Sequence, residues 1–212
     1  MRMRTWLLAA MGAGASLACL AAPALAQAGP GTARADSIHP PWNAEDVSFM
    51  TGMIAHHAQA VRMANWAPTH GASDAVRGLC ARIAVGQTDE IHFMQRWLRE
   101  RNQPVPDPDD PHAEHAMPGM AHAMLMPGML SAGQMAELDG ARGREFDRLF
   151  LLYMIQHHQG ALTMVQHLFD TPGALMDDLV FKYASDISAD QTTEIDRMGR
   201  MLGALSVGSG NP

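Results

Sequence analysis

Apolar residues recur at helical spacing along four segments of the chain. In the first segment, residues separated by about 100° per position share one mostly apolar face. That face holds Asp46, Phe49, Met50, Met53, His57, Ala60 and Ala64, with His56 and Met63 at its edge. Asn43 precedes an acidic turn and predicts the start of this helix, and the break at 68–73 predicts its end. Further helices are predicted over about 74–101, from 131 or 136 to 169, and over about 175–205.

The helical segments form an internal repeat. At an offset of 101, Asp46, Phe49, Met53, Ile54, His56, His57, Ala60 and Met63 recur as Asp147, Phe150, Met154, Ile155, His157, His158, Ala161 and Met164. At an offset of 104, Ile83, Gln87, Thr88, Glu90, Ile91, Met94 and Leu98 recur as Ile187, Gln191, Thr192, Glu194, Ile195, Met198 and Leu202. The chain is therefore two copies of a helix pair, 43–101 and 131–206, joined by residues 102–130. Two short-looped pairs with one long connection are typical of an all-α four-helix bundle, here residues 43–206.

The N-terminus has the pattern of an export signal over residues 1–26. A basic start precedes an apolar run, and Ala24 to Ala26 form an A-x-A site, so cleavage is expected after Ala26 and the protein is expected to be periplasmic or secreted. A retained membrane anchor and a lipid anchor on Cys19 are weaker alternatives. Residues 27–42 are expected to form a flexible segment and residues 207–212 a disordered tail.

Removal of the signal leaves Cys80 as the single cysteine, so no internal disulfide can form. Cys80 is then a core thiol, a soft metal ligand or a link between two chains, and the core role is favoured.

Charge and composition narrow the class of ligand. The chain has 15 Lys and Arg against 22 Asp and Glu, which excludes the basic face that nucleic acids or anionic membranes require and favours cations instead. It also has 18 Met and 11 His. So much Met indicates either an adaptable core or a thioether-rich metal surface.

The repeated helices combine thioether and imidazole groups. Met53 with His57, and Met154 with His158, are four residues apart and therefore neighbours on a helix. Such mixed ligands favour Cu(I) and Ag(I), whereas Zn more often recruits Cys or carboxylate. Copper is thus the expected ion, with Cu(I) preferred and Cu(II), Ag(I) and Zn as alternatives. In the alternative interpretation, the Met residues fill the core and the His residues are hydrogen-bonded core groups.

The partner helices add a polar stripe to the predicted interior. It consists of Gln87, Glu90, Gln191 and Glu194, which are expected to surround the imidazoles as a second layer. The sequence does not distinguish which His of each pair would be the ligand.

The connection between the repeats is dense in the same ligand types. His112, His115, Met117, Met120, His122, Met124, Met126 and Met129 form an open tract rich in Met and His, broken by Pro and Gly. Tracts of this composition suit secondary metal capture. The alternative is a solvated spacer whose Met-Pro-Gly-Met units merely dock on the bundle.

The repeated F-M-x-x-M-I-x-H-H-x-x-A and Q-x-x-E-I segments, with M-P-G-M before the second copy, resemble the family known as domain of unknown function 305. The resemblance implies a ferritin-like four-helix bundle and a role like that of exported members implicated in copper binding and resistance. It implies the metal ligands Met53, His56, His57, Met63, Met154, His157, His158 and Met164. One departure is that Gln59 becomes Gly160 in the second copy, so the two halves need not bind equally.

The sequence favours a non-catalytic protein that sequesters copper or hands it on, with a copper-transport or copper-resistance protein as a further candidate partner. A second hypothesis is a di-metal oxidative enzyme, which needs Glu-x-x-His on the ligand helices. Met53 and Met154 occupy the Glu position, which disfavours it. The third hypothesis is a structural or partner-binding bundle with a hydrogen-bonded His core. The oligomeric state is not predicted.

Overall fold

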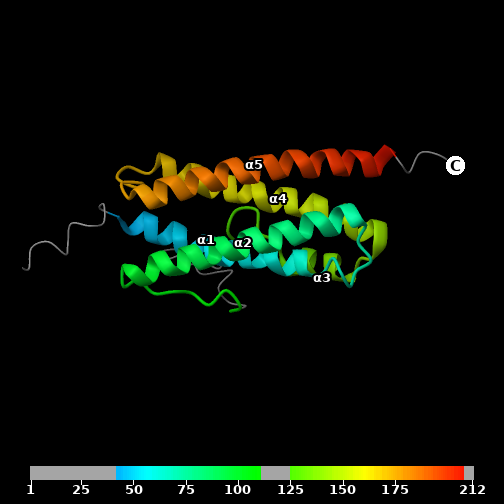
Figure 1. Cartoon of the computed structure of the whole chain (residues 1–212), viewed down its shortest axis with the longest axis horizontal. Coiled ribbons are helices and arrows are strands. Elements are labelled where there is room, and N and C mark those ends of the chain that lie inside the picture. The colour runs from blue at the N-terminus through cyan, green and yellow to red at the C-terminus, as the bar shows by residue number, and fades with distance from the viewer. Residues whose placement is uncertain (1–41, 111–124, 208–212) are drawn as a thin grey trace, which may run out of the picture. The chain divides into compact units, whose positions relative to one another are not determined.

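The computed structural model describes residues 42–110 and 125–207, which form five helices and no strand. They are α1 (Ala44–Asn65), α2 (Asp74–Glu100), α3 (Ala132–Gly140), α4 (Gly143–Asp170) and α5 (Asp178–Val207). The four long helices confirm the predicted all-α bundle of two helix pairs: α1 packs on α2, α4 packs on α5, and α1 contacts α4 (Figure 1). The signal sequence, the rest of the N-terminal segment, the linker residues 111–124 and residues 208–212 lie outside the described residues.

The two helix pairs are tied together by buried carboxylates at equivalent positions of the repeat. Asp46 closes the capping box of α1 with Asn43, and its Oδ1 also accepts a hydrogen bond from the Leu175 backbone N–H at 2.9 Å. Asp147 accepts in the same way from the Ser73 N–H, at 3.1 Å. Each repeat therefore caps the turn of the other, which accounts for the recurrence of this Asp.

One predicted helix is divided in two. The sequence predicts a single helix to Phe169 from Ser131 or Ala136, but Ser131 caps the short α3 and a separate helix begins at Gly143. Gly143 has a φ of +59°, a left-handed conformation that favours glycine, and its N–H donates to the His70 carbonyl at 2.8 Å. The chain turns here because α3 packs over the α1–α2 turn before α4 enters the bundle.

The last part of the connection is folded onto the bundle rather than open. Met126, Met129 and Leu130 are buried, and the first two lie in the same core cluster as Met53 and Met164. The expectation of an open tract is therefore wrong for residues 125–130, because these apolar side chains have a core surface to cover. No helix in the described ranges is long and apolar enough to cross a membrane.

Candidate metal centre

Four buried histidines form a row across the middle of the bundle. His56 and His57 come from α1 and His157 and His158 from α4, and all four are fully buried. The rings of His56 and His157 meet at the centre, with centroids 3.8 Å apart and planes inclined by 42°. Within each pair the centroids are 6.4 Å and 6.2 Å apart. Both histidines of each pair therefore point inward, whereas helical phase placed His56 at the edge of the face.

The outer histidine of each pair faces a glutamate from the partner helix. His158 Nε2 lies 2.6 Å from Glu194 Oε2 on α5, and His57 Nε2 lies 2.7 Å from Glu90 Oε2 on α2. The second contact is close but is not aligned as a hydrogen bond. The Glu residues are thus placed as the sequence predicts, beside the imidazoles. An imidazole held by a carboxylate at Nε2 has its Nδ1 available, which is the arrangement that orients metal-binding histidines.

The histidine row is not a satisfied hydrogen-bonded core. Within the described part of the chain, Nδ1 of each of the four rings has no hydrogen-bond partner, and neither has Nε2 of His157. The side-chain amide of Gln87 is equally without a partner, so this residue does not complete a network. Each buried polar atom without a hydrogen-bond partner destabilises the folded state by about 1–3 kcal/mol. A cation with imidazole ligands would remove that cost, so the residues fit a metal.

Thioethers flank the histidine row along both helices. Met53 and Met164 belong to one buried cluster, which also contains Met126 and Met129, and Met63 and Met154 belong to the other. Within the described ranges, no three His, Cys, Asp or Glu side chains are arranged to hold a metal. An ion in this centre would therefore need sulfur as well as nitrogen ligands.

The cysteine lies in the second cluster. Cys80 is buried and free, and burial, with the nearby Asp147 charge, raises the pKa of its thiol to about 12. A thiol in this state is a core group, not an accessible link between chains.

The folded segment 125–130 contributes backbone groups that the sequence analysis missed. His56 Nε2 lies 3.0 Å from the Pro127 carbonyl oxygen. Gln59 binds Leu130 twice, donating to its carbonyl at 3.1 Å and accepting from its N–H at 2.8 Å. Opposite Gln59, the backbone of Pro127 passes against Gly160. The exchange of Gln59 for Gly160 was the signal for this asymmetry. In the first repeat Gln59 hydrogen-bonds the segment, and in the second Gly160 has no side chain to block it.

Desolvation keeps the two central histidines neutral. Burial, together with the neighbouring His57, lowers the pKa of His56 to about 3. Burial and the adjacent His56 likewise hold the pKa of His157 well below 6.5. Neutral imidazole is the form that binds metals. These two rings are therefore in the ligand form throughout the neutral range.

The same shifts predict acid sensitivity of the metal-free protein. Below pH 6.5 the unfolded chain protonates His56 and His157 while the folded chain does not, so stability falls as the pH falls. The free energy of unfolding falls by about 1.4 kcal/mol per pH unit for each such proton. For His56 this amounts to about 2 kcal/mol between pH 6.5 and 5. Urea midpoints at pH 7 and pH 5 measure it. The double variant His56→Leu with His157→Leu should have a flatter profile, and an unchanged slope would contradict the assignment.

Comparison with known proteins places this arrangement in a family. The model of the family described as Domain of unknown function (DUF305) matches residues 46–202. The chain belongs to the DUF305 family. Its structure resembles a DUF305 fragment from Deinococcus radiodurans, with 30% identity, a TM-score of 0.64, and coverage of 78% of this chain and 99% of that one. No protein of curated function matches the chain.

Two further solved structures bear on the centre. A DUF305 protein from Streptomyces coelicolor, described as secreted, is 26% identical with a TM-score of 0.64, over 76% of this chain and 94% of that one. CopM in its Cu(II)-bound form is 30% identical with a TM-score of 0.55, over 75% and 96% of the two chains. CopM is also known in Cu(I)-bound and silver-bound forms. This DUF305 chain is therefore similar to a protein that binds copper and silver.

Proposed function

We propose that this DUF305 protein is an exported binding protein for Cu(I) or Ag(I), serving copper sequestration, resistance or delivery. The observation that carries the proposal is the buried row of four imidazoles between two groups of thioethers, in which each ring has a nitrogen without a partner among the described residues. The likeness to CopM supports copper and silver as the ions. Export is supported by the N-terminal sequence pattern and by the secreted relative.

The proposed ligands are the eight side chains of the repeated motif. They are Met53, His56, His57, Met63, Met154, His157, His158 and Met164. Among them, His57 and His158 are the primary nitrogen ligands through Nδ1, because Glu194 holds Nε2 of His158 and Glu90 lies 2.7 Å from Nε2 of His57. Thioether and neutral imidazole are soft to borderline ligands, which favour Cu(I) and Ag(I) over oxygen-seeking ions.

The connection has a secondary role in this proposal. Met126 and Met129 lie in the core cluster that contains Met53 and Met164, so they extend the thioether group of the centre. His112, His115, Met117, Met120, His122 and Met124 fall outside the described residues and are proposed to capture metal from solution. The net charge of −7 attracts cations to the surface.

An anaerobic Cu(I) titration against a chromophoric competitor tests the centre. The double variant His57→Ala with His158→Ala is expected to weaken Cu(I) binding at least 100-fold, since it removes the two nitrogen ligands that the carboxylates orient. The matched control is His92→Ala with His167→Ala, which removes two exposed imidazoles from α2 and α4 and should leave the affinity unchanged.

Two further measurements separate binding from structure. Cu(I) should raise the melting temperature of the parent protein, because a ligand specific for the folded state stabilises it. Deletion of residues 111–124 should lower the number of weakly bound ions without removing the tight one. Equal Cu(I) affinity in the double variant and the parent would show that the histidine row is structural.

A further inference from the structure

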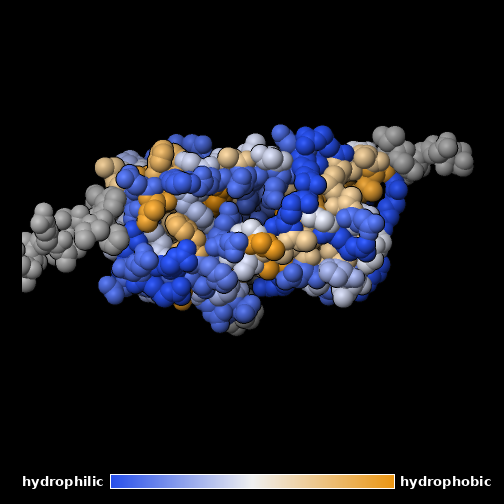
Figure 2. Space-filling view, viewed as in Figure 1, coloured by the Kyte–Doolittle hydropathy of each residue, from blue (hydrophilic) through white to orange (hydrophobic). Residues whose placement is uncertain are grey.

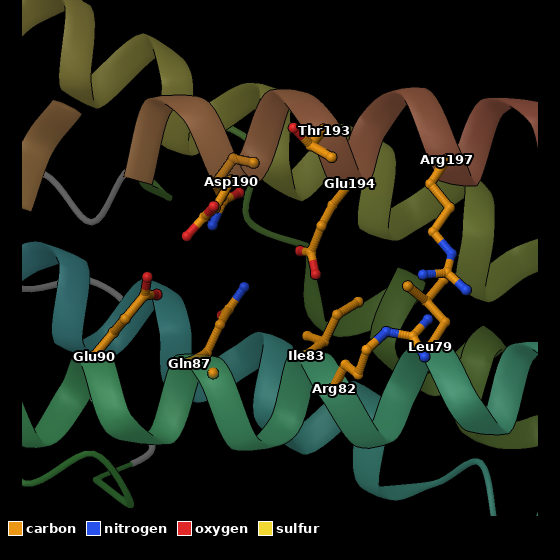
Figure 3. Close-up of a pocket in the computed structure, with 11 residues that line it drawn as sticks. Leu79, Arg82, Ile83, Gln87, Glu90, Asp190, Thr193, Glu194 and Arg197 are labelled. Atoms are coloured by element: carbon orange, nitrogen blue, oxygen red, sulfur yellow. The ribbon is translucent and has the colours of Figure 1, made fainter. Parts of the chain in front are cut away.

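The seam between α2 and α5 contains a cavity of about 260 Å³ on the outer side of the histidine row. Helices α2 and α5 come from different repeats, and both line the cavity, with Glu90 of α2 lying opposite Asp190 of α5 (Figure 3). The cavity lining includes Arg82, Gln87, Glu90, Gln191, Glu194 and Arg197. The space-filling view from the same side as Figure 1 shows mostly hydrophilic residues around this seam (Figure 2).

Charge is divided along the cavity. Glu90 and Asp190 lie at one end, and Arg82 and Arg197 lie at the other, with Glu194 between them (Figure 3). Three carboxylates, those of Glu90, Asp190 and Glu194, line this part of the cavity. Carboxylates that repel one another are stabilised by a cation.

Two buried amides are directed at the same space. Gln87 is 4% exposed and Gln191 3% exposed. Both amide atoms of Gln87, and the amide oxygen of Gln191, lack a hydrogen-bond partner within the described residues. The Gln87 amide points from α2 into the gap toward α5 (Figure 3). Unpartnered buried amide oxygens beside several carboxylates are the pattern of an oxygen-ligand cation site.

We propose that the acidic end of this cavity binds a hydrated divalent cation of the oxygen-seeking class, separate from the soft centre. Glu90 and Glu194 supply carboxylate oxygens, and Gln87 and Gln191 supply amide oxygens, directly or through the ion's water shell. In a cavity volume of this kind a water needs about 10–15 Å³, so about 260 Å³ holds an ion with its water shell. Such ions keep several waters when only one or two carboxylates bind them.

The position of this site gives it a defined relation to the histidine row. Glu90 and Glu194 are partly exposed, with 23% and 28% of their side chains accessible, and each contacts a fully buried histidine. The outer cation therefore neutralises the carboxylates on their solvent side while their inner oxygens hold His57 and His158. The site does not depend on the identity of the metal in the soft centre.

Mn²⁺ is the probe, because it prefers oxygen ligands over thioethers and its free ion is counted by electron paramagnetic resonance. The parent protein is expected to bind one Mn²⁺ tightly. The variant Gln87→Leu with Gln191→Leu should bind it at least tenfold more weakly. Its melting temperature without metal should rise, since the unpartnered amides are gone.

The matched control is Asp89→Asn with Asp196→Asn, which removes two exposed carboxylates from the same helices without touching the amides. It should change Mn²⁺ affinity by less than threefold. The proposal is overturned if the parent binds no Mn²⁺, if the Gln variant binds it as well as the parent does, or if the control loses as much affinity as the Gln variant. If the parent protein binds Mn²⁺ but not Cu(I), the soft centre is contradicted and the outer site is not, so the two failures are distinguishable.

Discussion

Replacement of Asp177 by alanine is expected to lower the free energy of unfolding by about 3–5 kcal/mol, because it leaves the buried Arg101 guanidinium with only the half-exposed Glu100, 3.8 Å away, as a counter-ion. Asp177 is fully buried, and its Oδ2 lies 2.5 Å from Arg101 Nη2 and accepts from the Trp97 indole N–H at 3.2 Å. Its Oδ1 accepts from the Leu179 N–H at 2.9 Å, at the start of α5. One carboxylate thus joins the end of α2 to the beginning of α5.

Urea unfolding of this variant should be compared with that of Asp178→Ala, the exposed next residue, which should change stability by no more than about 0.5 kcal/mol. The variant Arg101→Met with Asp177→Leu should recover most of the loss, because removing both charges leaves no unpaired ion. A loss below 1 kcal/mol in Asp177→Ala would show that the pair is open to water. Since Asp177 contacts Trp97, Arg101 and Leu179 rather than the histidine row, Cu(I) affinity of the folded variant should be unchanged.

Much of the helical frame follows from the sequence because its signals are local. The Asn43 cap and the break at 68–73 place α1, whose observed bounds are Ala44–Asn65. The offset repeat predicts that α4 and α5 pair as α1 and α2 do, which the structure confirms. These features depend on helical period and capping chemistry, which a short window of residues specifies.

The centre was only partly predictable because it depends on packing between distant segments. Helical phase directs His57 inward but leaves His56 at the edge of the apolar face. The structure buries His56 because His157 and the Pro127 carbonyl cover it, and both come from more than 70 positions away. The break between α3 and α4 likewise depends on the contact between His70 and Gly143, which no local pattern encodes.

The exchange of Gln59 for Gly160 is the clearest case of a sequence signal whose meaning is tertiary. By sequence it indicates only that the two repeats differ. In the structure it sets the direction in which the connection crosses the bundle, since Gln59 can grip the Leu130 backbone and Gly160 alone leaves room for Pro127. A symmetric duplicate with Gln at both positions would have no space for the segment that covers His56.

Gly160→Ala is accordingly expected to destabilise the protein by about 3 kcal/mol or more, although alanine is favoured over glycine inside a helix. A Cβ at Gly160 would overlap the backbone of Pro127 and Gly128. Gly128 has a φ of +76° and itself approaches the α4 backbone so closely that its own Cβ would lie 2.6 Å from the Gly160 Cα. Neither backbone can give way without lifting the segment and exposing Met126, Met129 and Leu130.

Gly199→Ala is the matched control, because Gly199 lies inside α5 with nothing near the position of a Cβ. That substitution should stabilise by about 0.5–1 kcal/mol, so the two variants should differ in sign. Hydrogen exchange gives the local measurement: Gly160→Ala should remove protection of the Leu130 amide, which donates to Gln59. Retained protection with unchanged stability would mean that the segment does not dock on α4. If Gly160→Ala removes this protection and also weakens Cu(I) binding, the docked segment contributes to the metal centre. The segment carries Met126, Met129 and the carbonyl that faces His56.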